Sequence, residues 1–126
     1  MEIKEFVREF SEKINDLVYR DKGVELRLHG NWVDIWYQNV RIGAIIRDVY
    51  RIARTIGYNS RKDLMFAVWE YEDSEYNYHP NEIEERLDKI LEINDKLYKK
   101  VKQIKILRRK KKIDKDFKVK KDLQKN

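Results

Sequence analysis

The chain has 126 residues, of which 29 are Lys or Arg and 23 are Asp or Glu, so its formal net charge is +6. It contains no cysteine, which excludes a disulfide framework, thiolate metal sites and thiol nucleophiles. No apolar run is long enough to span a membrane, and the first segment lacks the pattern of a signal peptide. We therefore expect a cytoplasmic protein that does not associate with membranes.

The charge is segregated along the chain. Residues 99–126 hold 14 basic and 3 acidic side chains, a local net charge of +11, which leaves −5 of the total +6 for residues 1–98. A mildly acidic body followed by a basic segment is typical of proteins that bind polyanions. We predict a compact α+β domain over 1–78, a long amphipathic, coiled-coil-like helix over 79–112 and a disordered basic tail over 113–126.

Residues 2–20 carry apolar side chains at spacings of three and four, which predicts a helix that ends before Gly23. Between residues 24 and 46 the apolar period changes to two. This indicates a two- or three-stranded antiparallel meander, with turns at residues 30–31 and 38–39, packed by one face on the first helix. The alternative is that a helix begins near residue 41.

Two short helices are predicted next, over 47–56 and from Ser60 to residue 71. Gly57 is placed as the C-cap of the first, and Ser60 with Asp63 resembles a capping box that opens the second. Together they would form a helix-turn-helix spanning residues 48–71. Residues 64–71 are also apolar enough on all sides to form a buried strand.

A helix-turn-helix would give the basic residues of this region a role in binding nucleic acid. They would contact phosphates or bases from one face of the first helix and from the start of the second: Arg47, Arg51, Arg54, Arg61 and Lys62. Asp63 and the aromatic residues Phe66 and Trp69 fit this motif poorly. The alternative is two ordinary core helices with a solvated arginine stripe.

The long helix opens at an N-cap formed by Asn81 and Glu84 and then carries an apolar seam of heptad spacing. The seam consists of Ile83, Leu87, Ile90, Asn94, Leu97, Val101 and Ile104. Asn94 could pair with its own copy across a two-fold axis, so we predict that the seam is the interface of a homodimer. The alternative is that the helix folds back onto its own domain.

Basic residues cluster where this helix ends: Arg108, Arg109, Lys110, Lys111 and Lys112. Such a cluster contributes affinity for DNA or RNA through counterion release, without sequence preference. The alternative is a tail that serves only solubility.

Two tryptophans, Trp32 and Trp36, are expected on the polar face of the strands, beside Arg27, His29 and Arg41. Aromatic rings beside guanidinium groups on a sheet can stack the bases of single-stranded nucleic acid. Cross-strand packing beneath another element is the alternative.

No catalytic residue, metal site or cofactor motif is apparent, since the two histidines are far apart in sequence and no phosphate-binding loop is present. We therefore expect a non-enzymatic nucleic-acid-binding protein, a small DNA-binding regulator or accessory factor whose basic tail contacts phosphates. The alternative is a protein-interaction or structural adaptor that uses Trp36, Phe66 and Trp69 as a partner surface. A small metal-dependent nuclease is a third hypothesis.

Overall fold

The computed structural model of the protein describes the backbone of residues 2–124 and the side chains of residues 2–113. Helix α1 (Ile3–Ile14) continues into a π-helical turn, η1 (Asn15–Tyr19), and a short 3₁₀ helix, η2 (Pro80–Glu82), precedes the long helix α2 (Leu87–Gln124). Between them lie the strands β1 (Val24–His29), β2 (Trp32–Tyr37), β3 (Val40–Ile46), β4 (Val49–Ile52), β5 (Thr55–Asn59), β6 (Leu64–Val68) and β7 (Asn77–Tyr78).

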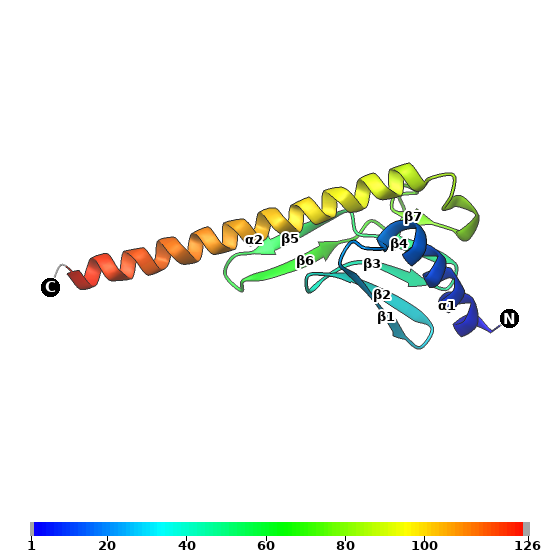
Figure 1. The fold of residues 1–126 in the computed structure, drawn as a ribbon, viewed down its shortest axis with the longest axis horizontal. Helices are drawn as coiled ribbons and strands as arrows, with labels where there is room; N and C mark the ends of the chain where they lie inside the picture. The colour runs from blue at the N-terminus through cyan, green and yellow to red at the C-terminus, as the bar shows by residue number, and fades with distance from the viewer. Residues whose placement is uncertain (1, 125–126) are drawn as a thin grey trace.

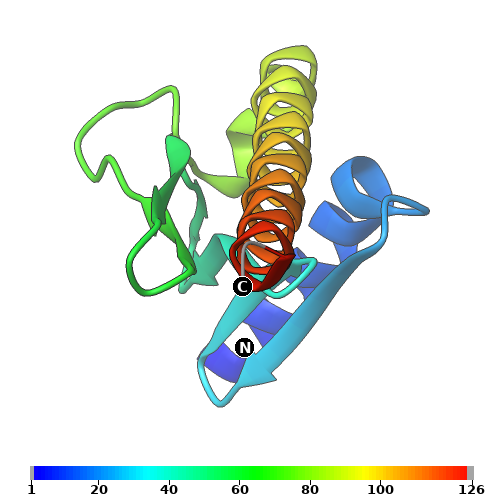
Figure 2. The ribbon, with the colours of Figure 1, turned by 90° about the vertical axis from the view of Figure 1, so that its left-hand side faces the viewer.

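Five strands form an antiparallel sheet in the order β1-β2-β3-β4-β7, and β5 and β6 form a separate antiparallel hairpin. Helix α1 packs on β2 and β3, while α2 packs on β3 and β5 and continues past the β5–β6 hairpin (Figure 1). Viewed along α2, the β1–β2 and β5–β6 hairpins lie on opposite sides of this helix (Figure 2). The predicted N-terminal and C-terminal helices are thus confirmed.

The buried face of the five-stranded sheet follows from the alternation of side chains along β2. Val33, Ile35 and Tyr37 are buried in the core with both helices, whereas Trp32 and Trp36 point to the opposite face. A change of register after Ile35 bends β3 against β2. Gly43 lies at this bend, where a Cβ atom would come within 3.0 Å of the Arg51 carbonyl oxygen and 3.1 Å of Ile35 Cδ1.

The predicted meander and helix-turn-helix are wrong, because residues 47–71 form strands β4, β5 and β6 rather than two helices. Along β4 the buried side chains of Tyr50 and Ile52 alternate with the half-buried side chains of Val49 and Arg51. The apolar spacing that predicted a helix therefore also fits a strand. The turn between β3 and β4 is made by Arg47 and Asp48, with Arg47 at φ 55°.

The residues read as helix caps belong to the β5–β6 hairpin. Gly57 is no C-cap, since the Phe66 ring lies directly over it and would clash with a Cβ atom there. In the hairpin turn, Asn59 Oδ1 accepts hydrogen bonds from the backbone N–H groups of Arg61 and Lys62. The alternative for residues 64–71, a buried strand, is confirmed only as a strand over Leu64–Val68, because Leu64 and Phe66 are exposed.

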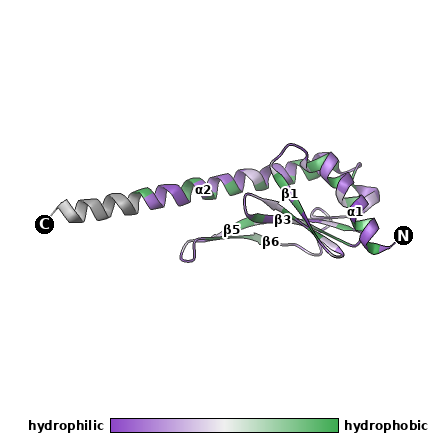
Figure 3. Ribbon diagram, turned by 60° about the horizontal axis from the view of Figure 1, so that its bottom comes forward, coloured by the Kyte–Doolittle hydropathy of each residue, from purple (hydrophilic) through white to green (hydrophobic). Residues whose placement is uncertain are grey.

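The apolar stripe of α2 faces the sheet of its own chain (Figure 3). Every seam residue is buried except Leu87, which is half-buried. The structure therefore confirms the alternative in which the helix folds back onto its domain. A homodimer stays a prediction, but this seam is occupied within one chain.

The two ends of α2 also differ from expectation. Asn81 lies inside η2, whose capping box is formed by His79 and Glu82, and α2 begins only at Leu87. Its helical backbone continues to Gln124, through most of the segment predicted to be disordered. Residues 125–126 of that segment lie outside the described part of the chain.

Asn94 does not meet a second copy but joins a buried polar network in the core. Its Nδ2 donates to the Tyr50 hydroxyl at 3.2 Å and to the Ile90 carbonyl at 2.9 Å. The Tyr50 hydroxyl also shares a hydrogen bond with the Tyr19 hydroxyl, and the two rings meet edge to face. Burial raises the pKa of both tyrosines, which keeps this network neutral.

Replacing Tyr50 by Phe should destabilise the fold, because it removes hydrogen-bond partners of both Tyr19 and Asn94 from a dry site. The expected loss is about 1–3 kcal/mol of unfolding free energy, measured by denaturant titration. Tyr71→Phe is the control, since Tyr71 is 61% exposed and should leave the stability unchanged. Equal stability of the two variants would contradict a structural role for the network.

The buried tyrosines also predict an alkaline limit of stability. Burial raises the pKa of Tyr19 and Tyr50, and the pKa of Tyr78 rises to about 12 for the same reason, whereas an unfolded tyrosine titrates near about 10. Because the native pKa is raised, the neutral buried tyrosines contribute fully to the free energy of unfolding below about pH 10, and this contribution is lost as the pH rises above that value. Thermal unfolding midpoints should therefore decrease as the pH is raised above this value, and tyrosinate absorbance should show that the buried tyrosines ionise as the protein unfolds. Titration of all tyrosines near pH 10 in the folded protein would contradict this.

Candidate nucleic-acid interface

The face of the five-stranded sheet that points away from the helices carries a cluster of aromatic and basic side chains. The Arg27 guanidinium lies 4.6 Å from the centroid of the Trp36 ring, and the His29 ring stacks on Trp32 at 5.8 Å. The Arg41 guanidinium lies 4.8 Å from the centroid of Trp69, which follows β6. We call Arg27, His29, Trp32, Trp36, Arg41 and Trp69 the tryptophan face.

Strand register brings these side chains together. His29 is directly opposite Trp32, and Trp36 is directly opposite Arg41, so each tryptophan of β2 has a basic neighbour on the adjoining strand. Cross-strand neighbours on one face of an antiparallel pair are close enough for aromatic and long basic side chains to interact. The predicted placement of Trp32 and Trp36 beside Arg27, His29 and Arg41 on the polar face is confirmed.

Asp34 holds the basic side chains of this face in place. Its carboxylate is 3.2 Å from His29 Nε2 and 3.4 Å from Arg41 Nη1, and the residue is only 8% exposed. A carboxylate that is buried this far needs positive partners. It therefore orients Arg41 while neutralising part of the positive charge.

A shallow groove of about 350 Å³ opens beside Asp34. Its lining consists of Asn31, Trp32, Asp34, Arg41, Ala44, Ile46 and Arg47. The Trp32 side chain is 46% exposed, so one edge of the groove is an accessible indole ring. Arg47, from the β3–β4 turn, is exposed on the groove lining and makes no ion pair among the described residues.

The structure gives the other basic residues of the supposed helix-turn-helix separate positions. Arg51 lies on β4, where its Nε donates to Asn77 Oδ1 at 2.9 Å and its guanidinium lies 4.5 Å from the Tyr71 ring centroid. It therefore anchors the connection between β6 and β7. Arg54 is exposed between β4 and β5.

A second basic cluster forms where the tip of the β5–β6 hairpin meets α2. Arg108 Nε donates to Asp63 Oδ1 at 2.6 Å, and Arg108 Nη2 donates to the Asp63 carbonyl at 2.9 Å. This contact brings the exposed Arg61 and Lys62 of the hairpin turn to the basic part of α2. The neighbouring helix residues Arg109, Lys110, Lys111 and Lys112 are exposed.

Hydrogen bonds tune the charges at this second cluster. Tyr58 donates to Asp63 Oδ1 at 2.5 Å, and this bond, together with that from Arg108, lowers the pKa of the Asp63 carboxyl. Asp63 stays ionised and holds Arg108, so Arg108 is occupied by the fold. Arg61, Lys62, Arg109 and Lys110 to Lys112 are exposed and remain available to an anion.

Sequence reasoning grouped Trp69 with Trp36 only as part of a protein-partner surface and did not place it over Arg41 beside the basic residues of the strands. Trp69 reaches the sheet only because β6 pairs with β5 and the chain then returns along β4 through β7. The one local signal was the run of aromatic residues from Phe66 to Tyr71, which was assigned to a helix. No group of three or more potential metal ligands occurs in the described part of the chain.

Asp63→Asn should loosen the hairpin from α2, because an amide binds a guanidinium more weakly than a carboxylate does. Amide hydrogen exchange of residues 57–66 should become faster, while the five-stranded sheet stays protected. The wild type should behave like the variant as the pH falls through the lowered pKa of Asp63. Arg54→Gln, remote from the contact in sequence, is the control, and unchanged exchange in Asp63→Asn would refute the tether.

Comparison with known proteins finds no family model that matches the chain, and no similar curated protein or solved structure. Among the described residues, no helix combines the length and the apolar character that crossing a bilayer requires.

Proposed function

We propose that the protein binds nucleic acid without catalysing a reaction. Bases of a single strand stack on the tryptophan face, and phosphates meet the basic residues around it. The observation that carries this proposal is the pairing of each tryptophan with a basic side chain on one sheet face: the His29 ring stacks on Trp32, and guanidinium groups lie over the other two rings, Arg27 over Trp36 and Arg41 over Trp69. A cytoplasmic location is also proposed, and it rests on the absence of cysteine.

The chemistry of this face suits unpaired bases. Nucleobases stack on indole rings and on guanidinium planes, and each stacked base contributes about 1–3 kcal/mol. Trp32 offers an exposed ring at the edge of the groove, and the Arg27 and Arg41 planes continue the surface across the sheet. Arg47, on the groove lining, is in position to contact a phosphate.

The basic residues of α2 supply affinity that does not depend on sequence. Arg109 and Lys110 to Lys112 are exposed, and the hairpin turn adds Arg61 and Lys62. Neutralising phosphates with such residues releases counterions and makes affinity fall steeply with salt. This cluster binds duplex and single strand alike, so any preference for single strands has to come from the tryptophan face.

The second candidate function is binding of a protein partner. It is favoured by exposed apolar side chains: Trp32 (46%) and Ile46 (44%), which lie directly opposite each other, and Phe66 (45%) and Leu64 (54%) on β6. A partner protein would use the apolar area of all these residues, whereas a nucleic acid would use ring faces and positive charge. The two functions therefore differ in their response to salt and to loss of an aromatic ring.

The test is a titration of the protein with single-stranded DNA, single-stranded RNA and duplex DNA at several salt concentrations. Trp32→Ala should weaken single-strand binding about tenfold, the loss expected for one stacked base, with an unchanged salt slope. Ile46→Ala is the matched control, because Ile46 lies directly opposite Trp32 and is equally exposed but has no ring. It should change binding little.

A second arm replaces Lys110, Lys111 and Lys112 together by Gln. This variant should lose affinity for all three nucleic acids, and the slope of log K against log salt should fall by about 0.7–0.9 for each lost phosphate contact. Equal losses in Trp32→Ala and Ile46→Ala would favour a protein partner. No salt-dependent binding by the wild type would reject the proposed function.

A further inference from the structure

Strand β1 is an open edge of the sheet. The opposite edge is β7, which is only two residues long, whereas β1 has six residues and contains no proline. Long, unprotected edge strands are available for pairing with another strand. The Leu28 side chain on β1 is also 48% exposed. Val24 and Leu26 pack partly against the core, so it is the outer backbone edge of β1 and the Leu28 side chain that lack a neighbour among the described residues.

The turn between β1 and β2 fixes which backbone groups of β1 face outward. A two-residue loop, Gly30 and Asn31, joins the strands, and His29 is directly opposite Trp32. The turn hydrogen bond runs between these two residues, so the backbone groups of His29 point toward β2. By the alternation of an antiparallel ladder, those of Arg27 and Glu25 do so too. The N–H and C=O groups of Val24, Leu26 and Leu28 therefore point to the open edge.

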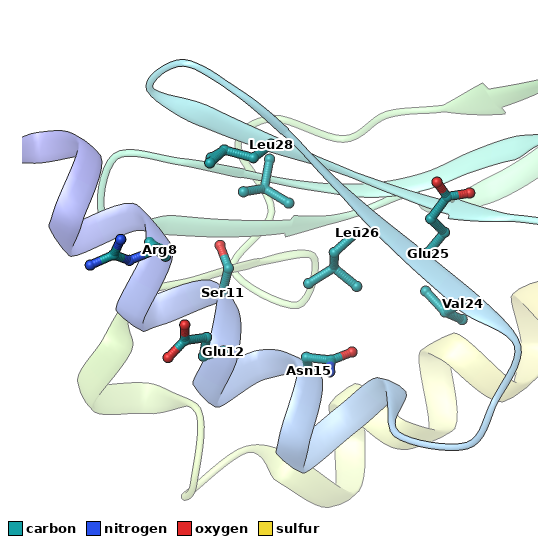
Figure 4. A pocket seen from close by; sticks show the side chains of 9 residues that line it. Arg8, Ser11, Glu12, Asn15, Val24, Glu25, Leu26 and Leu28 are labelled. Carbon is teal, nitrogen blue, oxygen red and sulfur yellow. The ribbon is translucent and has the colours of Figure 1, made fainter.

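The same three residues have apolar side chains on the helix side of the sheet. A groove of about 450 Å³ separates them from α1, with Arg8, Ser11, Glu12 and Asn15 on its helix side (Figure 4). Helix α1 makes its main sheet contacts with β2 and β3. The groove between α1 and β1 leaves space on this side for the side chains of a strand added beside β1.

The side chains of β1 are complementary to themselves in one antiparallel register. With Leu26 opposite its own copy, Val24 faces Leu28 of the second chain and Glu25 faces Arg27 on the other side of the sheet. All the outward backbone groups are then hydrogen-bonded, apolar side chains meet apolar ones, and both charged pairs are attractive. Shifting the register by two residues either way places Glu25 opposite Glu25 or Arg27 opposite Arg27. A shift by one residue instead brings side chains of opposite faces together.

We propose that β1 pairs with β1 of a second copy of this chain, antiparallel and centred on Leu26, and that this edge is the interface of a homodimer. The pair joins the five strands of each copy into one continuous sheet and the two α1–β1 grooves into one trough with apolar side chains on its sheet side. Arg27 then has Glu25 of its own chain at 3.1 Å and Glu25 of the second chain as carboxylate neighbours. This interface does not depend on the proposed binding of nucleic acid.

Cysteine scanning tests the register directly, because the chain has no cysteine of its own. Leu26→Cys should form a disulfide-linked dimer under mild oxidation, since a hydrogen-bonded antiparallel pair places its Cα atoms about 5.5 Å apart. Leu28→Cys alone should not crosslink, because its counterpart lies four residues away along the second strand. An equal mixture of Val24→Cys and Leu28→Cys chains should crosslink to each other.

Charge reversal gives a second readout, without oxidation. Arg27→Glu places only carboxylates at both outer pairs and should raise the dimer dissociation constant on the order of tenfold, measured by light scattering across a concentration series. The double exchange Glu25→Arg with Arg27→Glu restores opposite charges and should restore the dimer. Circular dichroism confirms that each variant is folded.

Two results would overturn the proposal. One is a wild-type protein that stays monomeric at every concentration tested, together with no crosslinking of Leu26→Cys. The other is equal crosslinking of Leu26→Cys and Leu28→Cys, or a double exchange that dissociates as readily as Arg27→Glu, because neither agrees with the register. Absence of salt-dependent nucleic-acid binding by a wild-type protein that does dimerise would count against the proposed function alone.

Discussion

The packing of the apolar stripe of α2 on the sheet is the interaction on which the rest of the structure depends. Ile90, Leu97 and Val101 are fully or almost fully buried. They share the core with the buried residues of α1, which packs on β2 and β3. Burial of side chains of this size is worth about 1.5–3 kcal/mol each, before conformational entropy is subtracted. Since both helices lie on one face, the opposite face of the sheet is left for other chemistry. The position of α2 thus separates a dry structural face from an exposed tryptophan face.

That exposed face is ordered rather than merely polar. Each tryptophan there meets a basic side chain, and Asp34 fixes two of these side chains, His29 and Arg41, from a buried position. An indole ring that faces solvent is costly as apolar area, and a guanidinium plane covers part of it while keeping its own charge hydrated. A flat aromatic ligand could take the place of a guanidinium group over an indole ring, or stack on the guanidinium itself. Such an arrangement suits a flat aromatic ligand better than an irregular apolar one. The structural and the proposed functional roles of Arg27 and Arg41 are therefore compatible.

The sequence predicts the elements in which one period is unambiguous and fails where two periods fit. Alternation along residues 24–37 defines a hairpin because apolar residues, Val24, Leu26 and Leu28 and then Val33, Ile35 and Tyr37, occupy every second position on either side of a Gly-Asn turn. Around Tyr50 and Ile52 the apolar residues satisfy a helical and an extended spacing equally, and the β-branched and aromatic side chains of Val49, Tyr50 and Ile52 were the better guide to a strand. The heptad seam of α2 was recognised, but a pattern cannot tell whether its cover is a second helix or the chain's own sheet. Likewise Trp32 and Trp36 were placed on the correct face, whereas Trp69 depended on the non-local return of β6.

Beyond Arg108, α2 extends past the domain, so burial in the core no longer stabilises the helix there. The bond between Arg108 and Asp63 is a tether between this part of the helix and the body, while Ile106, Leu107 and Ile113 are all at least 60% exposed. Arg108 and Lys112, like Arg108 and Lys111, are like charges at spacings of four and three, which weakens a helix by about 0.2–0.5 kcal/mol per pair. Phosphates bound along this surface would remove that repulsion, so the binding proposed for α2 and the helicity of its projecting end are thermodynamically linked. A polyanion would stabilise the helix, and each increment of helicity would hold the basic side chains in a regular array for the polyanion.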